Sequence, residues 1–204
     1  MNLDEWRYIF IITGIFAVSI VAMPVISTYF PQTQEPFFAM AVLGKRLQAG
    51  DYYPTDELIL NIREPVPWNI YLFNQMGESQ YTSIKVKILS NSVASPNTSL
   101  CIPSPAPVIY EFRNILLSNE TKIVPFTWEI IGTYNDADTT IISKIKINES
   151  PIDVDIVIEN DKSLRLVLEL WLYNNISTEF SFAWISNGEP RCIWNQLWIT
   201  FDFS

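Results

Sequence analysis

The chain of 204 residues carries 13 basic and 22 acidic side chains, a net charge of −9, two cysteines and no histidine. Without an imidazole, no Ser-His-Asp or Cys-His catalytic pair and no histidine-ligated zinc, copper or haem site can form. The basic residues form no cluster, which argues against nucleic acid as a partner. We therefore expect a protein that is not an enzyme and that carries no cofactor.

The first predicted element is an uncharged apolar run from Tyr8 to Phe30. At about 1.5 Å per residue, a helix of this length reaches about 34 Å, enough to cross a hydrocarbon core of about 30 Å. Trp6 and Arg7 at one end, and Tyr29 at the other, are residue types that anchor a helix at the membrane interface. The run therefore predicts a transmembrane helix over residues 8–30, in contact with the lipid bilayer.

A cleaved signal peptide is the alternative interpretation of the same run. Val25 and Ser27 offer small residues at plausible −3 and −1 positions. A signal peptide, however, has a basic segment before its apolar core, whereas here Asp4 and Glu5 outweigh Arg7. The run is also longer than the usual apolar core of a signal peptide. We therefore expect an uncleaved anchor.

The chain downstream of the run is expected to lie outside the membrane, with the N-terminus inside. All the N-x-S/T sequons occur there, and glycosylation of a sequon requires exposure outside the cytoplasm. They begin at Asn97, Asn119, Asn148 and Asn175. The expected organisation is a short cytoplasmic N-terminus (1–7), the transmembrane helix (8–30), a linker (31–36) and an extracellular or pseudo-periplasmic domain (37–204).

The two cysteines, Cys101 and Cys192, both lie in Pro-containing loop sequence of that domain. In an oxidising compartment we expect a disulfide between them. A bridge that closes about 90 residues contributes about 3–5 kcal/mol in the loop-entropy model. The alternative is two separately buried thiols.

Most of the remaining sequence predicts short β-strands separated by turns that contain Pro or Gly. Residues 91–107 are rich in Ser and Pro and are expected to form a loop. The strands expected on either side of this loop, up to residue 158, cover 37–43, 57–62, 68–73, 82–89, 108–117, 122–134, 139–147 and 154–158. The alternative for 37–43 is that this apolar segment is the last contact of the helix with lipid.

The clearest strand covers Leu164–Leu172, in which every second residue is leucine. A period of two collects the leucines on one face, whereas helical spacing would scatter them. The other face, which includes Arg165, Glu169 and Trp171, is expected to be mixed in polarity. We therefore expect Leu168→Ala to cost about 2–5 kcal/mol of stability and Glu169→Ala to cost little.

The last two strands, 180–185 and 197–203, are expected to pair across a loop that opens with Asn187-Gly188, a dipeptide favoured in hairpins. With the earlier segments this makes about nine or ten strands. The predicted fold is all-β: an antiparallel immunoglobulin-like β-sandwich preceded by one N-terminal transmembrane helix.

Two stretches carry a resemblance to a known family. The first has Tyr53-Pro54, the strand Trp68–Asn74 before Gly77, and Tyr81; the second has Leu164–Asn175, Phe180, Phe182, Trp194 and Leu197–Phe203. Together they resemble the extracellular β domain of an uncharacterised archaeal membrane-protein family, a domain of unknown function. The resemblance implies the fold and an envelope-facing setting, and it assigns no catalytic residue. Two departures are Arg63-Glu64-Pro65 in place of a Gly turn and a single span where relatives often carry several.

Acidic loop residues offer a weak candidate for a cation. Asn135, Asp136 and Asp138 place oxygen ligands close together, as a hard cation such as calcium requires. The glycine and the distal glutamate of a calcium loop are missing, so we favour a solvated hairpin tip over a calcium site. Asp153 and Asp155 alternate with apolar residues and are expected on a wet sheet face.

Aromatic and small residues offer candidates for an interface. Gly14 and Ala17 of the apolar run share a side on which another helix can approach closely. Core packing explains most of the seven tryptophans, but four can also form an aromatic platform for sugars or a partner subunit: Trp171, Trp184, Trp194 and Trp198.

Two classes of function follow. The first is a non-catalytic structural or accessory subunit of an archaeal envelope or membrane protein complex, whose partners are other membrane or envelope subunits. The second is a surface module that binds a glycan or a cation through aromatic side chains and acidic loops.

Overall fold

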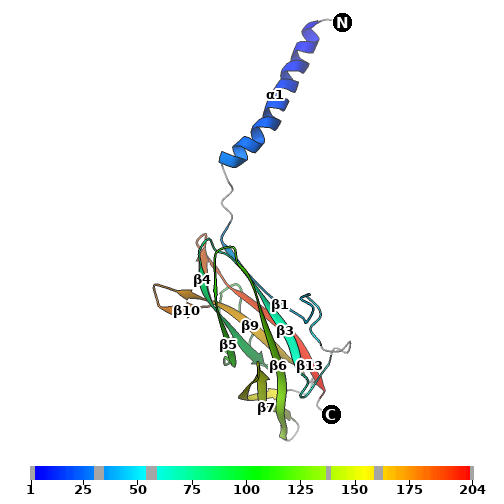
Figure 1. Cartoon of the computed structure of the whole chain (residues 1–204), viewed down its shortest axis with the longest axis vertical. Helices are drawn as coiled ribbons and strands as arrows, with labels where there is room; N and C mark the ends of the chain where they lie inside the picture. The colour runs from blue at the N-terminus through cyan, green and yellow to red at the C-terminus, as the bar shows by residue number, and fades with distance from the viewer. Residues whose placement is uncertain (1–2, 30–34, 54–58, 137–138, 159–162, 203–204) are drawn as a thin grey trace. The chain divides into compact units, whose positions relative to one another are not determined.

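The computed structural model describes residues 3–29, 35–53, 59–136, 139–158 and 163–202. These residues belong to two compact units, Met1–Glu35 and Pro36–Ser204. Figure 1 shows the first as a single helix and the second as a β domain. Phe30, most of the expected linker, Asp138 and parts of the strands expected at 57–62 and 197–203 lie outside the described residues.

The first unit is one continuous α-helix, α1 (Leu3–Tyr29), which includes nearly all of the expected span. The hydroxyl groups of Thr13 and Ser19 are satisfied within the helix, because Thr13 Oγ1 and Ser19 Oγ donate to carbonyl oxygens four residues earlier, at 2.8 and 2.9 Å. Among the residues that the structure describes, no helix is both long and apolar enough to qualify as a membrane span.

The described residues of the β domain form two large sheets and one small one. The first large sheet has the order β1-β3-β6-β7-β8, and every pair in it is antiparallel. Its strands are β1 (Phe37–Leu43), β3 (Val66–Gln75), β6 (Thr121–Asp136), β7 (Thr139–Ile147) and β8 (Ser150–Ile158).

The second large sheet has the order β2-β13-β9-β4-β5, with β10 added to β9. Strands β2 and β13 are parallel, and the other pairs are antiparallel. The strands are β2 (Leu60–Asn61), β13 (Ile193–Asp202), β9 (Ser163–Asn174), β4 (Gln80–Leu89), β5 (Tyr110–Leu116) and β10 (Glu179–Ser181). A small hairpin joins β11 (Trp184–Ser186) to β12 (Glu189–Arg191).

The two large sheets share one hydrophobic core. Trp68 and Trp128 lie fully buried with their rings 5.3 Å apart, and Trp128 reaches the other sheet at Phe201, at 6.2 Å. All the leucines of the alternating strand are buried in this core, as expected: Leu164, Leu166, Leu168, Leu170 and Leu172. The expected mostly-β class with one N-terminal helix is confirmed.

The pairing expected for the last strands is wrong. Residues 180–185 do not pair with 197–203 in the described structure; they divide between β10 and β11, and β13 pairs with β9 and β2. Asn187 and Gly188 have φ angles of 52° and 81°, so they form a two-residue hairpin turn that connects β11 directly to β12. The expected strand at 57–62 is reduced to Leu60–Asn61 in the described residues.

Candidate functional site

The second large sheet buries charged side chains on the face that points away from the core. Lys87 on β4, together with Arg165 and Glu169 on β9, has at most 7% of its surface exposed. Residues 90–107, which we call the covering loop, supply many of the atoms that these side chains bind. Buried charges are stable only when they are paired and hydrogen-bonded, so these contacts determine how the loop is held.

Lys87 and Glu169 form the centre of this arrangement. Lys87 Nζ lies 2.9 Å from Glu169 Oε2 and donates to the carbonyl oxygen of Ser104 at 2.6 Å. The backbone N–H of Ser104 donates to Glu169 Oε1 at 2.7 Å, and Trp171 Nε1 donates to Oε2 at 3.1 Å. Glu169 is fully buried, which contradicts the partly wet strand face from which we expected Glu169→Ala to cost little.

Arg165 ties down the start of the covering loop. Its guanidinium donates to Ser95 Oγ at 2.7 Å and to the carbonyl oxygen of Ser90 at 2.6 Å, and it also binds the carbonyl oxygen of Val93. The same group lies 5.2 Å from the ring centre of Trp198. The expectation of a mixed face on β9 is therefore corrected at Arg165 and Glu169, because the loop excludes water from both charges.

A third group of contacts, after those of Glu169 and Arg165, joins the covering loop to the start of β13 and includes both cysteines. Cys101 is buried and Cys192 is partly buried, and both are free thiols. Each Sγ donates toward the carbonyl oxygen of Thr98, at 3.5 and 3.7 Å, and Trp194 Nε1 donates to Thr98 Oγ1 at 3.0 Å. Burial, and then the neighbouring Cys101 thiol, raise the pKa of Cys192 to about 12. The two thiols are therefore neighbours, and the disulfide between them stays a prediction.

We expect Cys101 and Cys192 to be linked when the protein matures in an oxidising compartment, since their thiols already lie together. Peptide mapping without reductant should recover one linked pair, and Cys192→Ser should abolish it. A linked pair closes a loop of about 90 residues, so the oxidised protein should resist unfolding by about 3–5 kcal/mol more than the reduced protein. Two alkylatable thiols in freshly prepared, unfolded protein would contradict this prediction.

The candidate tryptophans lie in different settings. Trp171 and Trp194 are half-buried, and their indole N–H groups are bonded inside the domain. Lys85 Nζ lies 3.4 Å from the ring centre of Trp171, and burial lowers the pKa of Lys85. Trp184 packs against the main core, whereas Trp198 is 56% exposed. Trp198 is thus the member of the set that presents most of its surface to a sugar or a partner.

The sequons and the small helix residues are accessible. The sequon asparagines are all exposed, which is consistent with glycosylation but does not test it: Asn97, Asn119, Asn148 and Asn175. Gly14 and Ala17 are exposed on α1. Their role in a helix interface stays a prediction.

The expected cation loop gains no support. Asn135 Oδ1 accepts a hydrogen bond from Thr140 Oγ1 at 3.2 Å, and Asp138 lies outside the described residues. Within the part of the chain that the structure describes, no group of three or more Cys, Asp or Glu side chains is placed to hold a metal ion.

Sequence reasoning missed the Lys87–Glu169 pair. β4 and β9 are neighbours in the sheet. Because β4 also carries Thr82, Ser83 and Lys85, and β9 also carries Arg165, each strand taken alone has the pattern of a partly exposed strand. The buried pair could be inferred only once the two strands were known to be neighbours. The covering loop itself carries no periodic signal, because its Ser and Pro residues look like those of any solvated loop.

Comparisons with known proteins give likeness of structure alone. No protein-family model matches the chain, and no curated protein matches it. One similar structure is the CARDB domain of a Pyrococcus furiosus protein in complex with di-metal ions, at 9% identity and a TM-score of 0.40, covering 83% of this chain and 96% of that one. Another is β-glucosidase from Listeria innocua in complex with isofagomine, at 10% identity and a TM-score of 0.36, covering 81% of this chain and 16% of that one. TM-scores this low carry no argument about function. The resemblance to an archaeal membrane-protein family that the sequence suggested stays a prediction, because no family model matches the chain.

Proposed function

We propose that the chain is a non-catalytic, single-pass membrane protein whose extracellular, immunoglobulin-like β domain serves as a structural or accessory subunit of an archaeal envelope or membrane protein complex. The observation that carries the proposal is the exposure of the apolar side chains of α1. Every residue from 8 to 20 is exposed, including Phe10, Ile12 and Phe16.

Consecutive residues of a helix point in all directions around its axis, so α1 has no polar face between residues 8 and 20. A helix that is apolar all round is stable inside lipid or among other helices, not in water. The proposed span is the full apolar run of the sequence, 8–30, and α1 includes this run up to Tyr29. Lipid on some sides of α1, and partner helices that pack at Gly14 and Ala17, would cover its apolar surface.

The β domain supports an extracellular assembly role. Its sequon asparagines are exposed, and its cysteines lie together as they would before oxidation outside the cytoplasm. The buried charged groups of Lys87, Arg165 and Glu169 are bound inside the domain, where they hold the covering loop.

We expect the full chain to partition into the detergent phase of a phase-separation assay, because α1 exposes apolar surface on every side. A chain that starts at Pro31 should partition into water as a folded domain. In mild detergent the full chain should elute above the mass of one chain plus its micelle, and the shortened chain should associate more weakly. A full chain that stays in the aqueous phase would overturn the membrane anchor, and a strictly monomeric full chain would overturn assembly.

A glycan-binding role is the second candidate, and the exposed ring of Trp198 favours it. Aromatic rings that lie flat on the surface can stack on sugars. A Trp198→Ala variant that loses binding to an archaeal surface glycan, while keeping its association state, would move this candidate to the front.

A further inference from the structure

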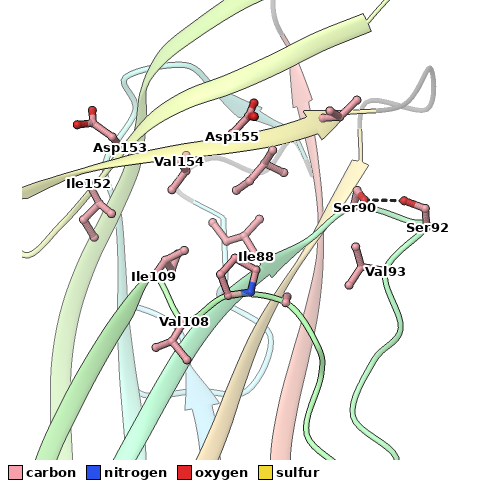
Figure 2. A pocket seen from close by; sticks show the side chains of 14 residues that line it. Ile88, Ser90, Ser92, Val93, Val108, Ile109, Ile152, Asp153, Val154 and Asp155 are labelled. Atoms are coloured by element: carbon pink, nitrogen blue, oxygen red, sulfur yellow. Dashed lines mark hydrogen bonds between the residues drawn. The ribbon is translucent and has the colours of Figure 1, made fainter.

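A half-open slot of about 720 Å³ lies between β8 and the segments that flank β4 and β5 (Figure 2). The strands β8 and β5 are the last in their respective sheets among the described residues, so the slot lies on an open side of the β domain. Ser90 Oγ and Ser92 Oγ bond to each other at 2.9 Å, so these two hydroxyls are already engaged. Aliphatic side chains supply much of the wall, among them Ile88, Val93, Ile109, Ile152, Val154 and Ile156.

Strand β8 presents two different faces beside this slot. Ile152, Val154 and Ile156 are half-buried, whereas Asp153 and Asp155 are exposed. Figure 2 shows Ile152 and Val154 pointing from β8 toward Ile88 and Ile109, and the two carboxylates on the opposite side of the strand. A strand added to the outer edge of β8 would therefore meet apolar side chains on one face and two negative charges on the other.

Strand β7, which pairs with the other edge of β8, shows which residues lie opposite the alternating apolar and acidic residues of β8. On β7, Ile142 and Ile145 lie opposite Ile156 and Ile152, and Lys144 lies opposite Asp153. Lys144 Nζ approaches Asp153 Oδ1 to 3.1 Å, yet 86% of the Asp153 side chain stays exposed. The carboxylate can therefore bind a second cation from the outer side.

The outer edge of β8 has no neighbouring strand among the described residues, so alternate backbone N–H and C=O groups along it can bind an added strand. A second copy of the chain is a poor occupant. Two β8 edges paired with each other would bring Asp153 and Asp155 of both copies together, and like charges on neighbouring strands repel. The net charge of −9 on each chain adds to that repulsion.

We propose that the outer edge of β8 and the adjoining slot bind an extended segment of a different protein in which apolar and basic residues alternate. The partner's backbone continues the sheet, its apolar side chains cover the slot, and its Lys or Arg side chains lie beside Asp153 and Asp155. This proposal rests on the assembly role proposed above and names the chemistry of the partner.

The test uses the full chain in a neutral maltoside detergent and a fluorescent peptide in which Lys alternates with Ile or Val. Binding is measured by anisotropy, with empty micelles as the blank. The peptide should bind saturably, and its affinity should fall about tenfold in the variant Asp153→Lys/Asp155→Lys, because attraction becomes repulsion. That variant should instead bind a peptide in which Glu replaces Lys. The matched control is Glu179→Lys/Glu189→Lys, which makes the same charge change at exposed sites on β10 and β12.

A second variant, Val93→Trp, fills the slot without changing charge and should also weaken binding. Equal binding to all variants, or to a scrambled peptide of the same composition, would mean non-specific charge attraction and would overturn the proposal. The chain is also tested for self-association without peptide. If it self-associates, and Asp153→Lys/Asp155→Lys abolishes that association, then β8 pairs with a second copy and the proposal is overturned. Specific peptide binding by a protein that elutes as a monomer would support the docking site and contradict the assembly role. Failure of the peptide to bind a protein that does elute in complexes would overturn the docking site alone.

Discussion

Replacing Glu169 by Ala is expected to lower the free energy of unfolding of the β domain by about 3–5 kcal/mol. The substitution leaves Lys87 Nζ buried and charged without its carboxylate partner, and it leaves the N–H of Ser104 without its acceptor. Urea unfolding followed by tryptophan fluorescence measures the loss, with an unchanged slope as evidence that the unfolding reaction is the same.

The control for this prediction is Arg113→Ala, which breaks a carboxylate–cation pair of similar geometry at the surface and leaves the Glu111 carboxylate to accept from Ser83 Oγ. Glu111 Oε1 lies 3.0 Å from Arg113 Nε, but the two side chains are 29% and 57% exposed. Water replaces much of such a pair, so its loss should cost about 0–1 kcal/mol. The double variant Lys87→Met/Glu169→Leu should recover the part of the loss that comes from the unpaired charge of Lys87, while the N–H of Ser104 stays without its acceptor. A small effect of Glu169→Ala by itself would show that the covering loop does not exclude water.

Replacing Leu168 by Ala is expected to cost about 2–5 kcal/mol, because the side chain is fully buried in the core that the two sheets share. Leu168 lies opposite Val86 on β4 and Asn195 on β13, so the cavity would open in the middle of the second sheet. The matched control is Thr200→Ala, at an exposed position of β13, which should change stability by less than about 0.5 kcal/mol. Equal and small losses at both positions would mean that the register of β9 is wrong.

Alternation made much of the fold predictable. The period of two in β9 predicted which face lies in the core that the two sheets share, and the segments expected at 37–43 and 139–147 match β1 and β7 at both ends. These strands carry their signal locally, since each residue's neighbour two positions away lies on the same face. The order of strands in the sheets carried no such local signal, and the partner of β13 was therefore predicted wrongly.

The same distinction between local pattern and tertiary contacts holds for the candidate sites. The pairing of Cys101 with Cys192 could be expected from two cysteines in loops, and the structure places their thiols together. The environment of Glu169 could not be predicted, because it depends on a loop whose position is set by contacts with distant strands. The slot beside β8 was equally hidden, since it forms where the ends of two separate sheets face each other. The alternation of residues within a strand identified which side chains share a face. Which other segment covers that face depends on tertiary contacts.

The ties of the covering loop also impose an order on biosynthesis. Ser104 binds a glutamate 65 residues later in the chain, and Thr98 binds a tryptophan 96 residues later. The loop therefore leaves the ribosome well before the strands that hold it, and Lys87 stays hydrated until β9 has been made. Cys101 likewise meets its neighbour only after Cys192, the residue before β13, has emerged. For a nascent chain the loop is thus the last part to settle, and a chaperone or a thiol oxidase has that interval in which to act on it.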